Sequence, residues 1–100
     1  MAIALRGTSS TTNTAPPKPT GTVEGDLMVA YIIVYDSTNT CTPPSDTVPW
    51  NALNGASGHQ VAGGETQLFA FWKIAGASES ASYTFTLDPG GYTEYMIENA

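Results

Sequence analysis

The stretch EGDLMVAYIIVYD, residues 24–36, determines which fold class the chain can adopt. Its apolar run from Leu27 to Tyr35 is rich in β-branched and aromatic residues and is too short to favour a helix. The preceding Gly25-Asp26 pair is typical of a turn. Because no polar residue interrupts the run, we predict a long strand that is buried on both faces or lies centrally in its sheet. The side chains that face the core are either Leu27, Val29, Tyr31 and Ile33 or the opposite set.

Three further segments predict strands. In ETQLFAFWKI, residues 65–74, one face holds Leu68, Ala70 and Trp72, and the other holds Phe69, Phe71 and Lys73. In SYTFTL, residues 82–87, the inward set is Tyr83, Phe85 and Leu87. The last segment, YTEYMIE at residues 92–98, sets Tyr95 and Ile97 opposite Glu94, Met96 and Glu98.

A proline-rich segment follows a first short strand that we predict for AIALRG, residues 2–7. Residues 8–22 show no periodicity, and Pro16, Pro17 and Pro19 each lack a backbone donor. Proline is excluded from the interior of a sheet for this reason. We therefore predict that residues 8–22 form an extended Thr/Pro-rich loop or arm. It would be ordered only by contact with its own sandwich or with a neighbouring subunit.

Turn-forming residues separate the strands. Residues 37–64 are rich in Gly, Pro and Asn, and within them we expect Trp50 to plug one end of the core and residues 60–62 to form a short edge strand. AGASESA, residues 75–81, holds a glycine and serines that disfavour a helix, so we interpret it as a connector. Short strands separated by Gly/Pro turns predict an all-β fold, an antiparallel β-sandwich that is Ig-like or jelly-roll-like. We expect one domain over residues 1–100.

The charge balance disfavours several function classes. Charged residues make up 12% of the chain, and the net charge is −6. The only cations, Arg6, Lys18 and Lys73, are too scattered for a basic patch, so we predict no binding of nucleic acid or of an anionic membrane. The single cysteine, Cys41, is expected in a loop and cannot form an internal disulfide. The apolar run in MAIALRG is too short for an export signal.

No constellation of residues predicts catalysis. His59 has no second His or Cys nearby to complete a metal site, and the chain contains no Gly-x-Ser-x-Gly. We interpret acids such as Glu65, Glu79 and Asp88 as solvated surface groups. We therefore predict no enzymatic activity, no catalytic residue, no cofactor and no metal site.

Four motifs, in this order, resemble a β-sandwich module of bacteriophage virion proteins of the head-surface (decoration), minor-tail or tail-fibre type. They are RGTSSTTNT at residues 6–14, KPTGTVEGDLMVAYI at 18–32, TPPSDTVPW at 42–50 and FWKIAGASESASYTFTL at 71–87. The last motif is the most specific. Together the motifs cover most of the chain.

The resemblance implies a non-enzymatic structural protein of the virion that decorates or stabilises the surface of the head or tail. Its implied partners are other virion proteins, of the capsid or tail, and copies of itself. The alternative is a carbohydrate-binding or host-adhesion module of a tail fibre, with a host glycan as its partner. The family continues with further strands after the last matched one, so we expect either a shortened version of the module or a sheet that neighbouring chains complete.

An interface is therefore predicted at the last strand. We expect residues 92–98 to lie at an open sheet edge, where another chain can pair, in a homo-oligomer (a trimer as the working hypothesis) or on a larger virion protein. A Tyr95→Asp change is expected to weaken that association without unfolding the chain. Among the other aromatic residues, Trp72 and Tyr83 are expected in the core. The candidate interface residues are Tyr92, Tyr95, Met96, Pro16 and Pro17.

Overall fold

The computed structural model describes residues 7–11, 15–35, 39–53, 59–60, 66–88 and 90–100. These residues form eight strands and contain no helix, and all strand pairs are antiparallel. The all-β, antiparallel prediction is therefore confirmed. In chain order the strands are β1 Gly7–Thr11, β2 Leu27–Val34, β3 Thr40–Thr42, β4 Asn51–Ala52, β5 His59–Gln60, β6 Gln67–Ile74, β7 Thr86–Asp88 and β8 Thr93–Asn99.

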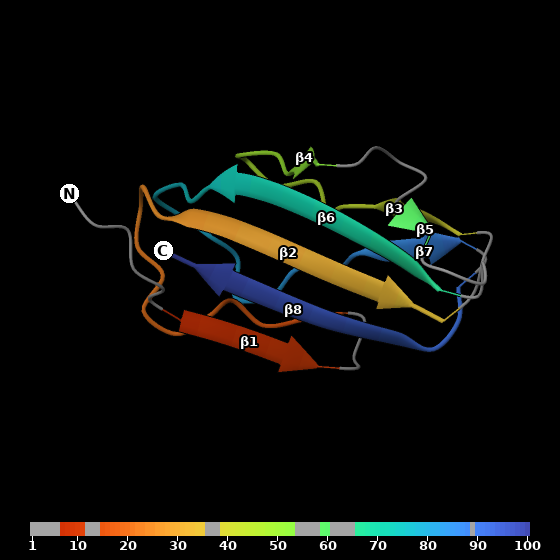
Figure 1. Ribbon diagram of the computed structural model, residues 1–100. Coiled ribbons are helices and arrows are strands. Elements are labelled where there is room, and N and C mark those ends of the chain that lie inside the picture. Colours follow the sequence, from red (N-terminus) through yellow and green to blue (C-terminus); the bar gives the residue numbers. More distant parts are fainter. Residues whose placement is uncertain (1–6, 12–14, 36–38, 54–58, 61–65, 89) are drawn as a thin grey trace.

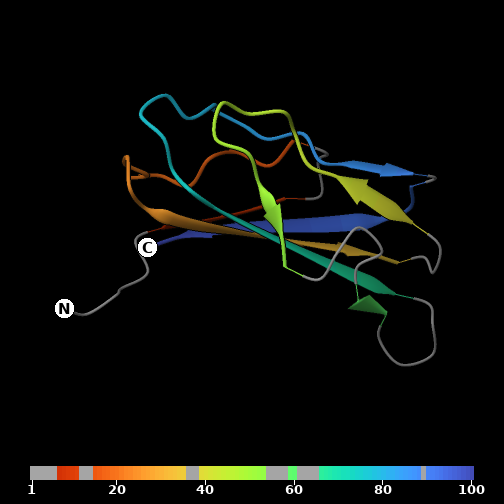
Figure 2. The ribbon, with the colours of Figure 1, turned by 90° about the horizontal axis from the view of Figure 1, so that it is seen from above.

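The strands lie in two layers that enclose one core. The first layer is a six-stranded sheet with the order β1-β8-β2-β6-β4, in which β5 also pairs with β6 (Figure 1). The second layer contains the two-stranded sheet of β3 and β7 and the extended segments that meet at the bridge between Pro17 and Ser82. Figure 2 shows this layer above the large sheet. The molecule is thus a β-sandwich with one regular and one largely irregular layer.

A tight turn sets the beginning of β2. Gly25 has φ of 93°, a left-handed conformation that favours glycine, and the Asp26 amide donates a hydrogen bond to the Val23 carbonyl at 3.1 Å. The Asp26 carboxylate in turn accepts hydrogen bonds from the Val23 amide at 3.0 Å and from Asn99 Nδ2 at 3.2 Å. The predicted turn is confirmed, and its aspartate fastens the turn to the end of β8.

The central strand β2 lies between β8 and β6, and its inner side chains form the middle of the core. These residues are Met28, Ala30, Ile32 and Val34, all buried. Ile32 lies opposite Tyr95 of β8 and Phe69 of β6. Of the two sets that the sequence left open for β2, the one opposite to Leu27, Val29, Tyr31 and Ile33 therefore faces the core. The other set is half-buried or exposed, because the described second layer covers only one face of the sheet.

Aromatic rings from both layers fill the core. Trp50 meets Tyr83 edge to face with ring centroids 5.3 Å apart, and it lies 5.6 Å from Phe85. Phe85 also contacts Tyr95 of β8. The core positions predicted for Trp50 and Tyr83 are confirmed. The core position predicted for Trp72 is wrong: this side chain lies on the opposite face of β6 and is 36% exposed.

The prediction that the last strand lies at an open edge is wrong, because β8 is paired on both sides. Thr8 of β1 lies opposite Glu98, and Ile33 of β2 lies opposite Glu94. The partner β1 comes from a segment whose sequence carries no strand pattern, so the pairing was not foreseeable locally. In the described part of the sheet, the edges are β1 on one side and β4 with β5 on the other.

The Thr/Pro-rich segment lies along its own sandwich. Its first residues form β1, which extends the large sheet, whereas the predicted strand at residues 2–7 lies almost wholly outside the described residues. Further along, the Lys18 amide donates to the Ala81 carbonyl at 2.8 Å, and the Tyr83 amide donates to the Pro16 carbonyl at 3.0 Å. The missing backbone N–H groups of the prolines are therefore not needed here, since the amides of Lys18 and Tyr83 donate both hydrogen bonds of this bridge.

Two neighbouring isoleucines test the assignment of the faces of β2. Ile32→Ala should lower the free energy of unfolding by about 2–5 kcal/mol, because it leaves a cavity in the packed core. Ile33→Ala removes the same atoms from the opposite face and should cost no more than about 1 kcal/mol. Urea denaturation of both variants provides the measurement. Equal losses, or a larger loss for Ile33→Ala, would show that the faces are assigned incorrectly.

Candidate functional site

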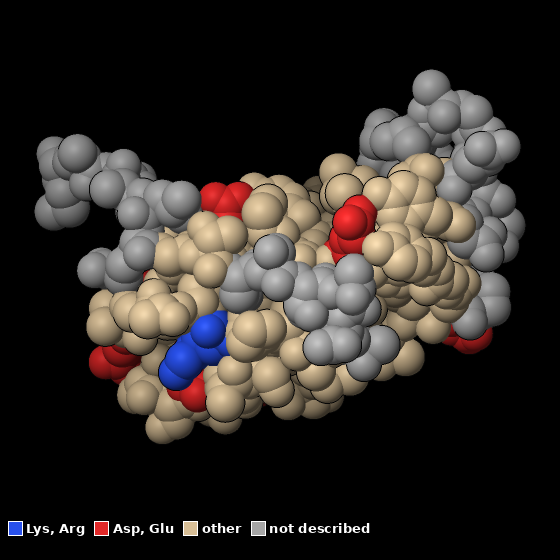
Figure 3. All heavy atoms as spheres, turned by 90° about the horizontal axis from the view of Figure 1, so that it is seen from below, with Lys and Arg blue, Asp and Glu red and all other residues tan. Residues whose placement is uncertain are grey.

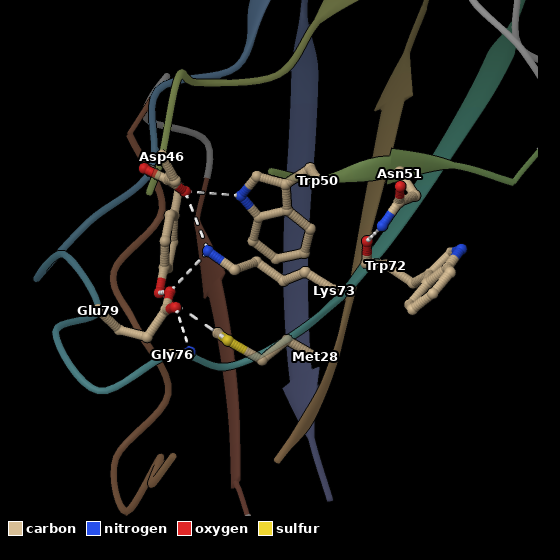
Figure 4. Close-up of polar contacts among 9 residues, drawn as sticks. Met28, Asp46, Trp50, Asn51, Trp72, Lys73, Gly76 and Glu79 are labelled. Carbon is tan, nitrogen blue, oxygen red and sulfur yellow. Dashed lines mark hydrogen bonds and ion pairs between the residues drawn. The ribbon is translucent and has the colours of Figure 1, made fainter. Parts of the chain in front are cut away.

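A buried charged cluster, Asp46, Lys73 and Glu79, lies inside the sandwich, and we call it the ionic cluster. Lys73 is on the inner face of β6 and is 1% exposed. Its Nζ atom lies 2.9 Å from Glu79 Oε1 and 3.3 Å from Asp46 Oδ2. Figure 4 shows Lys73 reaching toward both carboxylates, whereas the adjacent Trp72 points to the other side of β6. The two carboxylates compensate a charge that would otherwise be very costly to bury.

Each carboxylate is also held by donors other than the lysine. Trp50 Nε1 donates to Asp46 Oδ2 at 3.0 Å. The Tyr83 hydroxyl donates to Glu79 Oε1 at 2.6 Å, and the Gly76 amide donates to Glu79 Oε2 at 2.8 Å. These bonds hold the connector after β6 against the core, as Figure 4 shows for Gly76 and Glu79. The predicted connector is therefore folded around the lysine charge.

Two aromatic rings flank the lysine ammonium. Nζ lies 5.3 Å from the Trp50 ring centroid and 5.6 Å from that of Tyr83, distances at which a cation is attracted by an aromatic ring. Burial raises the pKa of Tyr83, and so does its hydrogen bond to the Glu79 carboxylate. Burial also raises the pKa of Glu79, but the hydrogen bonds from Tyr83, Lys73 and Gly76 outweigh it, and the net pKa is lowered. Glu79 is therefore ionised at neutral pH, and Tyr83 is protonated.

None of these three charged residues is predicted as a site from the sequence. The interpretation of Glu79 as a solvated surface acid is wrong, because its side chain is only 7% exposed. A carboxylate among Ala, Gly and Ser appears polar and exposed unless its partner is known. The available signal was the alternation of β6, which places Lys73 on the same face as two phenylalanines. Asp88 is exposed as predicted, and Glu65 lies outside the described residues.

A hollow of about 250 Å³ opens beside the ionic cluster, between residues 45–48 and residues 76–80. The side chain of Lys73 is fully buried, whereas those of Asp46 and Glu79 are 12% and 7% exposed. Solvent in the hollow therefore reaches the two carboxylates but not the ammonium. The lysine is closed to a large external molecule and open only to its own neighbours.

The side of the six-stranded sheet that faces away from the second layer is the outer face, and Figure 1 is viewed from this side. Leu27 lies opposite Ile74 across β2 and β6, and both side chains are exposed. Glu94 and Glu98 on β8 border this apolar area. Contiguous exposed apolar surface of this kind is typical of an interaction site. Its apolar residues are Leu27, Val29, Tyr31, Ile33, Leu68, Trp72 and Ile74.

Two exposed tyrosines form an aromatic pair next to β8. The Tyr35 and Tyr92 rings have centroids 5.5 Å apart with an interplanar angle of 46°, and the two residues are 50% and 61% exposed. The Tyr35 hydroxyl donates to Glu94 Oε2 at 2.6 Å. This hydrogen bond, together with the charge of Glu94, raises the pKa of Tyr35. The result is an open aromatic surface with a carboxylate at its side.

The five predicted interface residues do not lie together on one surface. Tyr92 and Pro17 are exposed, and Met96 is half-buried on the outer face. Tyr95 is 3% exposed and packs in the core, and the side chain of Pro16 is fully buried. Neither of these two side chains is accessible in the folded chain. The sequence did not predict their burial, because local alternation and proline content do not reveal which segment covers a residue. A Tyr95→Asp change would therefore place a charge in the core instead of testing an interface.

The remaining sequence candidates carry no assembled site. Among the described residues, no group of three or more His, Cys, Asp or Glu is arranged to hold a metal ion. Cys41 lies in β3, not in a loop, and burial raises its pKa to about 12, so the thiol is protonated. The His59 backbone belongs to β5, but its side chain lies outside the described part of the chain. The described residues include no helix with the length and apolarity needed to cross a membrane.

The visible surface carries few charges. Figure 3 shows Asp and Glu scattered over a mostly uncharged surface, with a single area of Lys or Arg. The net charge is −6, and one of the three cations, Lys73, is buried. The exterior is therefore acidic and largely free of positive charge.

No protein-family model, curated protein or solved structure matches the chain in the three comparisons made with known proteins. Functional inference therefore rests on the ionic cluster, the outer face and the aromatic pair.

Replacing the buried lysine tests what the ionic cluster contributes to stability. Lys73→Met keeps the length of the side chain but leaves two carboxylates uncompensated, so the free energy of unfolding should fall by about 3–5 kcal/mol. Lys18→Met is the matched control, since it removes a charge from a less buried site and should change stability by no more than about 0.5 kcal/mol. Urea denaturation at neutral pH measures both. Similar values for the two variants would contradict a stabilising role for Lys73.

Proposed function

We propose that this chain is a non-enzymatic structural protein of a bacteriophage virion that binds another protein of the particle through its outer face. The observation that carries the proposal is the apolar strip of β2 and β6, which the described second layer leaves uncovered. Burial of such a strip against a partner removes apolar surface from water and drives association. The four motifs that resemble phage virion modules support the same interpretation.

The charges around the outer face favour a partner of a particular kind. Glu94 and Glu98 border the strip on β8, and the described outer-face positions of β2, β6 and β8 include no cation. Two copies that met face to face would bring carboxylates into the same interface without counter-charges, which is unfavourable. The preferred occupant is therefore a different virion protein with an apolar surface and with Lys or Arg opposite β8.

The ionic cluster supports a structural role. Lys73 is the only lysine among the buried described residues, and it is enclosed by its own chain and not presented to an external substrate. Its contacts with Asp46 and Glu79 hold the loop before β4 and the connector after β6 to the large sheet. A stiff scaffold with an open apolar face is suited to a particle-surface protein that must keep its shape.

A charge placed in the strip tests the proposed attachment. Ile74→Glu should weaken attachment by about 2 kcal/mol or more, as for loss of a hot-spot contact, and should reduce the copies of the protein per particle. Thr84→Glu places the same group on an exposed position of the second layer and should leave the copy number unchanged. Quantitative mass spectrometry of purified particles measures the ratio to a major particle protein. Normal incorporation of Ile74→Glu, or wild-type protein found only free in lysate, would refute the proposal.

A second candidate function, binding of a host glycan, is favoured by the aromatic pair. Sugar rings stack on exposed aromatic faces, and a carboxylate beside them accepts hydrogen bonds from sugar hydroxyls. Tyr35, Tyr92 and Glu94 supply these groups on an open surface. This arrangement would suit a host-adhesion module, and it is separate from the centre of the outer face.

The role of the aromatic pair can be tested with one position and two substitutions. Tyr92→Ala should abolish binding to a glycan array, because it removes half of the stacking surface. Tyr92→Phe keeps the ring and should retain most of the binding. If the wild-type protein binds no host surface polysaccharide, or if the alanine variant binds as the wild type does, the aromatic pair has no such role.

A further inference from the structure

We propose that the ionic cluster is the site of an intramolecular isopeptide bond between Lys73 Nζ and Asp46 Cγ, formed by the chain itself with Glu79 as the proton-transfer group. The proposal concerns a covalent modification and does not depend on the function proposed above. Its basis is the meeting of an amine and two carboxylates in an aromatic-lined core, with the amine fully buried.

The geometry brings the reacting groups into contact. Nζ is 3.3 Å from Asp46 Oδ2, so the amine already contacts the carboxyl group whose carbon it would attack, and such proximity favours an intramolecular reaction. Both side chains are held from behind, the lysine by the rigid strand β6 and the aspartate by Trp50 Nε1. The amine and the carboxyl carbon are therefore kept in place, and little conformational freedom is left to lose when they react.

The second carboxylate supplies the proton transfer. Glu79 Oε1 lies 2.9 Å from Nζ and is ionised, so it can accept a proton from the ammonium and leave a neutral, nucleophilic amine. The nitrogen itself is fully buried between two aromatic rings, and burial of this kind favours neutral over charged species. Glu79 thus acts on the reacting nitrogen directly, whereas Tyr83 and Gly76 only hold the Glu79 carboxylate in place.

The reaction balances without any added reagent. Nζ attacks Asp46 Cγ, one carboxyl oxygen takes up the two protons that the nitrogen loses, partly by way of Glu79, and it departs as water. An ammonium and a carboxylate therefore give one neutral amide and one water molecule, and Glu79 is regenerated as the carboxylate. The Trp50 N–H is placed to stabilise the negative charge that develops on the Asp46 oxygen. The hollow beside Asp46 provides the route by which the water leaves.

Asp46 is the carboxyl group that reacts, because Glu79 is held by more hydrogen-bond donors. Glu79 accepts hydrogen bonds from Tyr83, Lys73 and the Gly76 amide, which together stabilise the carboxylate against attack. Asp46 borders the hollow with the more exposed side chain of the two. The product would join the loop before β4 to the middle of the large sheet and close the chain covalently between residues 46 and 73.

The test is the intact mass of the full-length chain, purified in its folded state. The linked protein should weigh one water molecule less than its sequence. Trypsin gives an independent readout, because it cannot cleave after a lysine whose side chain is an amide. A free Lys73 yields the fragments 7–73 and 74–100, whereas a linked Lys73 yields a single fragment 7–100, since the Lys18–Pro19 bond resists trypsin. A folded wild-type protein with its full mass would overturn the proposal.

Variants identify the atoms involved. Lys73→Met should restore the full mass, whereas Lys18→Met should not. This pair of results excludes a dehydrated aspartate elsewhere as the cause. Loss of water that persists in Lys73→Met would overturn the proposal. Asp46→Asn should lose one ammonia instead of one water, and this loss should disappear when Lys73→Met is added, whereas a succinimide at position 46 would persist. Fragment spectra that place the link on Glu79 would overturn the assignment to Asp46.

The proton-transfer role has its own readout. Glu79→Gln preserves the shape of the side chain, and its folded protein should form the link about 100-fold more slowly or worse, as expected for loss of an acid–base group. The fraction of the single tryptic fragment 7–100, followed over time after refolding, gives the rate. An unchanged rate in Glu79→Gln would refute the role of Glu79.

Discussion

The positive charge of Lys73 inside the sandwich is the constraint around which the loops of this protein are arranged. Taking an ammonium out of water is costly unless carboxylates and donors surround it. The chain meets this requirement with Asp46 from the loop before β4 and Glu79 from the connector after β6. Both segments contain little apolar bulk, so their positions on the core depend on polar contacts and on the rings of Trp50 and Tyr83.

Strand β6, which carries Lys73, also contributes to two different faces of the molecule. On β6, residues that alternate with Lys73 point outward, and Trp72 and Ile74 join the side chains of β2 in an exposed apolar strip. An ordinary half-buried sheet has a polar outer face. Here β2 is apolar on both sides, which explains why its sequence alone could not indicate which side faces the core. The inner side is identified by Ile32, which meets Phe69 and Tyr95 across both neighbouring strands.

Features that depend on local pattern were predictable from the sequence, and features that depend on distant partners were not. The strands β2, β6 and β8, the Gly25-Asp26 turn and the core position of Tyr83 follow from periodicity and turn chemistry within a few residues. The pairing of β1 with β8 joins the two ends of the chain and left no local signal. The burial of Glu79 likewise depends on Lys73 and Tyr83, which are neighbours in space through the fold.

The small number of cations also shapes the exterior. One of the three basic residues is buried together with two carboxylates, so the exterior keeps most of the net charge of −6, and the carboxylates of Glu94 and Glu98 stand beside the apolar strip. Like charges discourage two outer faces from meeting, while the strip itself favours burial. The partner that we propose is therefore apolar at its centre and basic at its rim. The carboxylates on the outer face, and not the buried lysine, therefore bear on which surfaces this face can bind.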